Sequence, residues 1–188
     1  IKAEVGNFSL ITYIIATSSS PTASGTTGGG GTYNYGASAT VTATPATGYQ
    51  FVNWTEGGAS VSTSASYTFT VNASRTLLAN FSLVNYTVST SSSPTAGGST
   101  SGAGTYSYGT LATITATPTI GYLFANWTQG GTVVSTNISY AFTVTGNRAV
   151  VANFTLITYS VSTSSSPSAG GTASGGGTYN PGTFATVA

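Results

Sequence analysis

The sequence repeats itself with a period of 73 residues, and this repetition limits what the chain can fold into more than any other feature. The phrase "GYQFVNWTEGG" at 48–58 returns as "GYLFANWTQGG" at 121–131, so that Trp54 and Trp127 lie 73 positions apart (127 − 54). A fixed period that extends over the whole chain is typical of tandem structural units. The same shift relates two further sets of residues: Pro21, Pro94 and Pro167; Tyr13, Tyr86 and Tyr159.

The period divides the chain into two complete units and two partial ones. The complete units are residues 11–83 and 84–156, and residues 157–188 match the opening part of a third unit. Residues 1–10 match the closing strand of a preceding unit. The partial segments contain nothing that corresponds to 43–73, so they cannot combine into one unit. We therefore interpret the chain as a segment of a longer array of repeats.

Apolar residues alternate with polar ones along most of each unit, which is the pattern of half-buried β-strands. In "YTFTV" the apolar face contains Tyr67, Phe69 and Val71, and the other face contains Thr68 and Thr70. No segment shows the caps and 3.6-residue period of a helix. The sequence predicts an all-β fold of tandem ~73-residue domains, β-grasp-like or sandwich-like, with about six short strands each and little or no helix. The expected core residues are Trp54, Tyr67, Phe69, Val71, Leu77 and Phe81, with their counterparts Trp127, Tyr140, Phe142, Val144, Val150 and Phe154.

Two segments of each unit interrupt this alternation. Phe51 and Trp54 would point to opposite faces of a regular strand, so either both faces are covered or a bulge turns the indole inward. We favour the bulge because Gly57 and Gly58 follow and mark a sharp change of direction. The glycine-rich runs "SGTTGGGG" and "GGSTSGAG" indicate flexible loops.

Charged residues make up only 3 % of the chain, against roughly 25 % in an ordinary soluble domain. With a net charge of +1, the chain lacks the excess of basic residues that binds the phosphates of nucleic acid. No apolar run approaches the ~18 residues of a membrane span. Acid–base catalysis, calcium binding and zinc binding all lack their usual side chains. We therefore expect no enzyme activity, no cofactor, no metal site, no nucleic-acid partner and no membrane insertion.

Six motifs follow one another within each unit in a fixed order. In the second unit they are "YTVSTSSSPTAGG", "GTYSYG", "ATITATP", "GYLFANWTQGG", "YAFTV" and "RAVVANF". This order resembles the divergent internalin-type B repeat, a relative of the Listeria–Bacteroides repeat. The resemblance implies extracellular tandem repeats of large bacterial or archaeal surface proteins, a small β-grasp-like fold, and roles as spacers, stalks and interaction modules. It implies no catalytic residues.

Asn-x-Ser/Thr triplets and tyrosines near glycine-rich segments are the candidate sites on the surface. Candidate N-glycosylation sites are Asn72, Asn137, Asn80 and Asn153. Of these, Asn72 and Asn137 are favoured because they lie in predicted turns, although such triplets also arise by chance in a chain this rich in Ser and Thr. Four tyrosines beside the glycine-rich runs are candidates for contact with an adjacent unit or with a partner: Tyr33, Tyr35, Tyr106 and Tyr108.

Two functions fit these observations. The first is a structural repeat module of an extracellular surface protein, which forms a stalk, sheath or filament by direct packing of β repeats. The alternative is an adhesin-type module that contacts glycans or protein through aromatic and glycine-rich loops. The near-identical copies favour the structural module, because a binder is expected to carry one distinctive copy. Expected partners are copies of the chain or neighbouring repeats, and glycans in the alternative.

The boundary between the two complete units is short. Only residues 82–85 lie between Phe81 and Tyr86. No Gly/Ser-rich linker is present, so we expect a stiff joint between the units. β edges that carry almost no Lys or Glu are expected to pair with neighbouring strands.

Overall fold

The computed structural model describes residues 9–188, which form two compact units that meet between Val84 and Asn85. The predicted all-β fold in tandem domains is confirmed. Helical structure in the described residues is limited to short 3-10 turns. The closing strand predicted at 1–10 lies outside the described residues, apart from Ser9 and Leu10, which precede the first strand. The 3-10 turns are η1 (Thr22–Ser24), η2 (Thr95–Gly97) and η3 (Ser168–Gly170).

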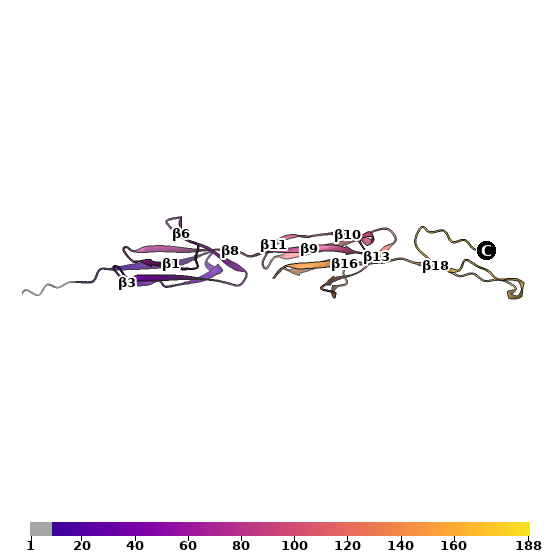
Figure 1. Cartoon of the computed structure of the whole chain (residues 1–188), viewed down its shortest axis with the longest axis horizontal. Helices are drawn as coiled ribbons and strands as arrows, with labels where there is room; N and C mark the ends of the chain where they lie inside the picture. Colours follow the sequence, from indigo (N-terminus) through magenta and orange to yellow (C-terminus); the bar gives the residue numbers. More distant parts are fainter. Residues whose placement is uncertain (1–8) are drawn as a thin grey trace, which may run out of the picture. The chain divides into compact units, whose positions relative to one another are not determined.

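Unit 1 is built from two β-sheets (Figure 1). The five-stranded sheet has the order β3-β1-β8-β5-β6, and the three-stranded sheet has the order β2-β4-β7. β1 pairs with β8 in parallel, and the other pairs are antiparallel. The strands are β1 (Thr12–Ser20), β2 (Gly25–Gly28), β3 (Gly31–Asn34), β4 (Ser38–Pro45), β5 (Tyr49–Glu56), β6 (Ala59–Ser62), β7 (Ser66–Thr70) and β8 (Arg75–Leu83).

Unit 2 repeats this arrangement strand for strand. Its sheets have the orders β11-β9-β16-β13-β14 and β10-β12-β15, again with one parallel pair, β9 with β16. The strands are β9 (Asn85–Ser93), β10 (Gly98–Ser101), β11 (Gly104–Ser107), β12 (Leu111–Pro118), β13 (Tyr122–Gln129), β14 (Thr132–Ser135), β15 (Ser139–Thr143) and β16 (Arg148–Leu156). A single residue, Val84, separates β8 from β9.

The opening hairpin of a third repeat follows β16, within the second compact unit. β17 (Tyr159–Val161) pairs antiparallel with β18 (Gly177–Tyr179). Tyr159 lies opposite Tyr179 in this pair, in the same register that places Tyr13 opposite Tyr33 in unit 1. The hairpin therefore has the register of the β1–β3 pair of unit 1.

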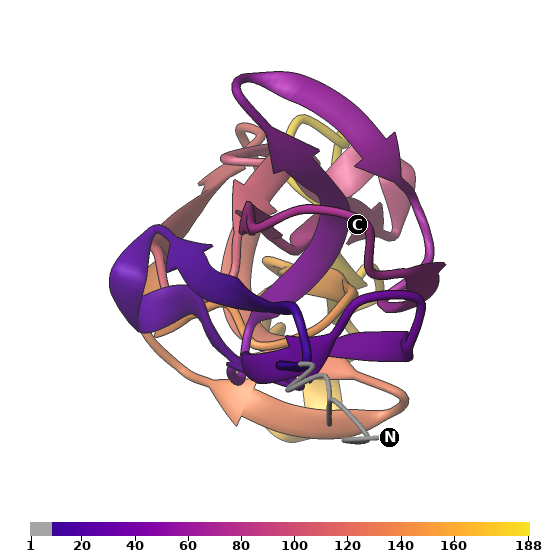
Figure 2. The same cartoon turned by 90° about the vertical axis from the view of Figure 1, so that its left-hand side faces the viewer.

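The two sheets of each unit enclose one shared core, which makes the fold sandwich-like. In the view of Figure 2 the indigo and purple strands of unit 1 curve around this common interior. The predicted register is confirmed, because Thr68 and Thr70 are exposed while Tyr67 and Phe69 pack against the core. Tyr67 and Phe69 are only half-buried, however. The buried core of unit 1 contains Ile15, Ala39, Val41, Ala43, Trp54, Val71, Leu77, Ala79 and Phe81.

Each complete unit has eight strands where about six were predicted. One additional strand in each unit is the short β6 or β14 that follows the double glycine. The other lies in the glycine-rich runs, parts of which pair as strands β2 and β10 and are not loops. The alternation of apolar residues cannot reveal these strands, since they have few side chains to alternate. Position 25 requires glycine because the backbone of β2 lies very close to neighbouring atoms. A Cβ on Gly25 would lie 2.6 Å from the Phe81 ring and 2.6 Å from the Thr44 carbonyl oxygen. The glycines thus let β2 pass directly over the core.

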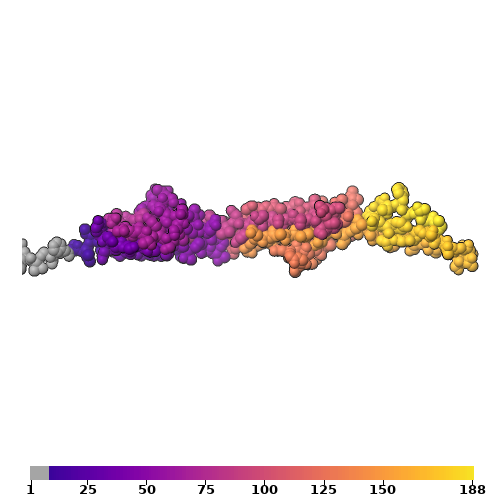
Figure 3. All heavy atoms as spheres, in the orientation of Figure 1, coloured from indigo at the N-terminus to yellow at the C-terminus, as the bar shows by residue number. Residues whose placement is uncertain are grey.

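The predicted bulge in the Trp-containing strand is confirmed. The pairing of β5 with β8 shifts between Phe51 and Asn53, which leaves Val52 without a partner in the ladder. The extra residue places Phe51 and Trp54 on the same side, with ring centroids 6.1 Å apart. Trp54 is completely buried, and its indole N–H donates to the Ala65 carbonyl at 3.4 Å. The β5–β6 hairpin that follows projects from the surface of unit 1 (Figure 3).

Candidate functional site

The asparagine of the closing "ANF" motif stabilises the bulge. Asn80 lies in β8, and its side-chain amide donates to the Asn53 Oδ1 at 2.9 Å and to the Thr55 hydroxyl at 3.1 Å. The equivalent Asn153 donates to the Asn126 Oδ1 at 2.8 Å. These bonds hold the strand segment on both sides of the tryptophan. The recurrence of asparagine in this motif therefore has a structural explanation.

We expect Asn80→Ala to destabilise unit 1 by about 1–3 kcal/mol, because the substitution leaves the bulge groups without their shared donor. Urea unfolding followed by Trp54 fluorescence in a Trp127→Phe background measures the change. Asn72→Ala is the matched control, since Asn72 is exposed in the turn between β7 and β8. Equal stabilities of the two alanine variants would contradict a role of Asn80 in holding the bulge.

The four candidate glycosylation sites fall into two structural classes. Asn72 and Asn137 are exposed in bends between strands. Asn80 and Asn153 lie within strands and are half-buried, and the amide nitrogen that would carry a sugar already donates hydrogen bonds. Accessibility of the amide thus favours Asn72 and Asn137, and glycosylation itself stays a prediction.

The four candidate tyrosines also separate into two classes. The hydroxyl groups of Tyr33 and Tyr106 each donate to a glycine carbonyl four residues earlier in the chain, at 2.8 Å. Their rings are half-buried against the core, so these two residues tie the glycine-rich turn to the strand that follows it. Tyr35 is 62 % exposed, with its ring centroid 6.4 Å from that of Tyr13. Tyr108 is half-buried, which leaves Tyr35 as the most accessible of the four.

An ion pair at one end of unit 1 is the strongest polar arrangement in the described residues. The Arg75 guanidinium donates from Nε to both Glu56 oxygens, at 3.2 Å and 3.0 Å, and from Nη2 to Oε2 at 2.7 Å. Its Cζ lies 4.4 Å from the centroid of Phe69 and 5.6 Å from that of Tyr67. The hydrogen bond from Arg75 is the main cause that lowers the pKa of Glu56 below its usual 4.5.

Unit 2 contains the same arrangement without the negative charge. Arg148 stacks on Phe142 at 4.1 Å, and its Nε donates to the amide oxygen of Gln129 at 2.7 Å. The sequence analysis did not predict this arrangement of an arginine on two aromatic rings. The available signal was that both arginines inside the units occupy the same repeat position, 73 residues apart.

The ion pair predicts that acid weakens unit 1 more than unit 2. Because the pKa of Glu56 is lower in the folded state, its contribution is present above about pH 5 and is lost as the pH falls through the folded-state value. The Glu56 side chain is 34 % exposed, so solvent screening limits the effect to about 1 kcal/mol or less. Urea unfolding of single-tryptophan variants at pH 7 and pH 3 measures it, and Glu56→Gln should remove the difference between the units. A pH dependence that survives in Glu56→Gln would contradict this origin.

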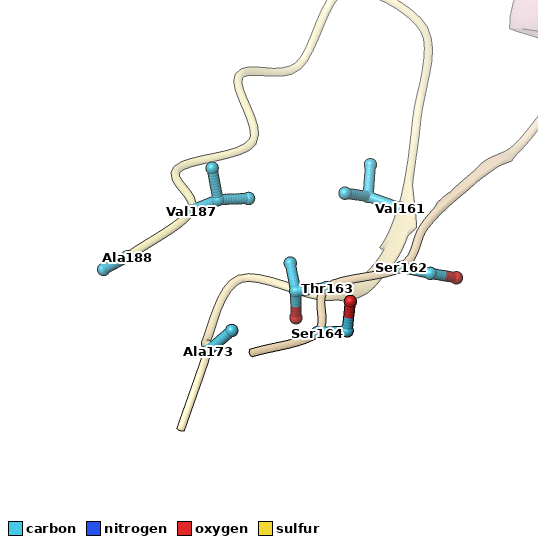
Figure 4. Close-up of a pocket in the computed structure, with 7 residues that line it drawn as sticks. All are labelled: Val161, Ser162, Thr163, Ser164, Ala173, Val187 and Ala188. Carbon is cyan, nitrogen blue, oxygen red and sulfur yellow. The ribbon is translucent and has the colours of Figure 1, made fainter. Parts of the chain in front are cut away.

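A hollow of about 560 Å³ lies inside the third repeat (Figure 4). Its lining includes Val161 and Val187. Val161 corresponds to Ile15 in unit 1, which is 1 % exposed, and Val187 corresponds to Val41, which is 0 % exposed. The hollow therefore corresponds to the core space of a complete unit.

No group of three or more metal-binding side chains occurs within residues 9–188. In the same part of the chain, no helix has the length and apolar character needed to cross a membrane.

Comparison with known proteins gives one family. The family model described as the divergent InlB B-repeat domain matches residues 15–85 and again residues 86–158. The two matches coincide closely with the two structural units. No curated protein and no solved structure gives a significant match to the chain.

Proposed function

Because the chain belongs to the divergent InlB B-repeat family, we propose that it is a structural repeat module of an extracellular surface protein. The family is typically found in bacterial surface proteins. In this role the β repeats pack directly on one another and form a stalk, sheath or filament, and the chain catalyses no reaction. The observation that carries the proposal is the near-equivalence of the two units in strand order, core and bulge.

The short connection between the units supports a stalk. One residue, Val84, separates the last strand of unit 1 from the first strand of unit 2. Its backbone N–H donates to the Gly48 carbonyl at 2.8 Å, so even this residue is held by unit 1. A connection of this kind leaves few free torsions, in contrast to a Gly/Ser-rich linker.

Distance measurement between the units tests the stalk. The chain contains no cysteine, so Thr44→Cys and Thr117→Cys, at equivalent exposed positions, can be spin-labelled without interference. We expect a narrow distribution of distances by double electron–electron resonance. A variant with a Gly/Ser insertion after Val84 is the control and should give a broad distribution. An equally broad distribution in the unmodified chain would reject direct packing of the repeats.

The sheet edges support association between chains. In unit 2 the edge strands of the two sheets are β10, β11, β14 and β15, and none contains a charged residue or a proline. Charged residues and prolines are the usual devices that prevent edge strands from pairing with other chains. Strand addition at such an edge satisfies the free backbone groups with hydrogen bonds.

Sedimentation velocity over a range of protein concentrations tests this association. We expect the unmodified chain to associate and Thr143→Lys, on edge strand β15, to weaken the association. Thr113→Lys, on the central strand β12, is the control, because the same charge is added away from the edge. A chain that stays monomeric at every concentration would argue against filament formation.

A further inference from the structure

The two equivalent arginines differ in how many of their guanidinium nitrogens donate hydrogen bonds to the neighbouring Glu or Gln side chain. In unit 1 the Glu56 carboxylate accepts from both Nε and Nη2 of Arg75. In unit 2 the Gln129 oxygen accepts from Nε of Arg148 only. Within residues 9–188, the terminal nitrogens Nη1 and Nη2 of Arg148 have only the Tyr140 hydroxyl as a hydrogen-bond partner, at 3.5 Å each. This distance is at the outer limit of a hydrogen bond, so both terminal nitrogens are free to donate to another acceptor.

The charge of Arg148 also has no counterion among the residues that the structure describes. Gln129 is neutral, and Glu56 is the only acidic side chain in the described residues, already paired in unit 1. The Arg148 side chain is only partly buried, so its outer edge can be reached from solvent. Stacking on Phe142 and the bond to Gln129 hold the guanidinium in one orientation. A group held in this way loses little conformational entropy when it binds a ligand.

We propose that Arg148 and Tyr140 form a binding site for the carboxylate of an acidic polysaccharide, that is, for a uronic acid residue. The planar guanidinium offers two parallel N–H donors, which match the two oxygens of a carboxylate. The Tyr140 hydroxyl adds a third polar group beside them. In unit 1 the equivalent arginine binds a carboxylate, that of Glu56, which shows that an arginine stacked in this way can hold a carboxyl group.

The surroundings favour a sugar acid over a protein partner. The exposed residues next in sequence to the site are small or polar: Gly130 and Gly131 after Gln129, and Asn147 before Arg148. A stable protein interface buries roughly 800 Å² on each partner around an apolar centre, whereas one charge and one hydroxyl on an open surface suit a single sugar ring. The inference does not depend on the proposed structural role, since a stalk module can carry such a site or lack it.

Titration of the chain with D-glucuronate, followed by NMR of the arginine side-chain nitrogens, tests the proposal. We expect the Arg148 signals to shift and those of Arg75 to stay unchanged, with D-glucose as the neutral control. Gln129→Glu should weaken binding by about 10-fold to 100-fold, because the new carboxylate would neutralise the guanidinium and take Nη2, as Glu56 does in unit 1. Glu56→Gln should create a second site, and the Arg75 signals should then shift as well. These two variants preserve the arginine stacking and avoid the loss of folding that a substitution of arginine risks.

Three results would overturn the proposal. The first is the absence of any glucuronate-dependent shift at Arg148 in the folded chain. The second is binding of equal strength in the unmodified chain and in Gln129→Glu, which would place the ligand elsewhere. The third is a stronger response to poly-L-glutamate than to polyglucuronate of similar length, which would assign the site to a protein partner.

Discussion

Replacement of Trp127 by Ala is expected to destabilise unit 2 by about 3–5 kcal/mol, the range for loss of a large buried aromatic side chain. Trp127 is fully buried, and its indole N–H donates to the Ile138 carbonyl at 3.3 Å. The substitution removes the largest side chain of the core and leaves a cavity between the two sheets. Because a small domain has only about 5–15 kcal/mol of stability, a large fraction of unit 2 should unfold at low urea concentration.

The loss should be confined to unit 2. Trp54 is the remaining tryptophan, and its fluorescence reports on unit 1 alone. We expect this signal to keep its unfolding midpoint, while hydrogen exchange measured by mass spectrometry shows lost protection over β9–β16. Thr113→Ala, an exposed position on β12, is the control and should leave both units unchanged. A simultaneous loss of unit 1 would show that the two units fold as one cooperative block.

Gly98→Ala is expected to destabilise unit 2 by about 3 kcal/mol, although it adds only one methyl group. A Cβ at this position would lie 2.5 Å from the Phe154 ring and 2.5 Å from the Thr117 carbonyl oxygen. The carbonyl belongs to β12, which pairs with β10 at this point, so it cannot move without breaking the ladder. Urea unfolding followed by Trp127 fluorescence in a Trp54→Phe background measures the loss.

Gly146→Ala is the matched control for this substitution. No atom lies within 4 Å of a Cβ built on Gly146, and its backbone does not have a positive φ angle. The same chemical change should therefore have little effect on stability there. Similar losses in Gly98→Ala and Gly146→Ala would show that backbone entropy, and not close packing, explains the glycine in β10.

Because the chain contains two copies of the same unit, the copies can be compared with each other position by position. Differences between the units mark positions where the fold tolerates change, and Glu56 against Gln129 is the clearest example. The arginine, both aromatic rings beneath it and the strand positions are retained, while the charge of the acceptor changes. The stacked arginine is therefore kept in both units, and only the charge of its hydrogen-bond acceptor differs between them.

The sequence by itself determined the parts of this protein that depend on periodicity. The 73-residue repeat predicted tandem units, and the two-residue alternation placed Thr68 and Thr70 outside, since side chains alternate across a strand. The bulge could also be predicted, because Phe51 and Trp54 both recur at a spacing that a regular strand cannot place on one face. The alternation and the bulge depend on neighbouring residues, and the repeat depends on comparing two stretches of sequence, so none of these features requires knowledge of which strands pair in space.

Only the tertiary structure decided the features that depend on residues far apart in the chain. Strands β2 and β10 form because glycines fit between a distant aromatic ring and the carbonyl of a neighbouring strand, and no pattern in "SGTTGGGG" records that fit. Asn80 and Tyr33 were candidate surface sites in the sequence, yet both are engaged in hydrogen bonds within their unit. The meeting of Arg148 with Gln129, 19 residues apart, is likewise a product of strand order. Contacts of this kind are set by how sheets pair and pack, which local sequence does not specify.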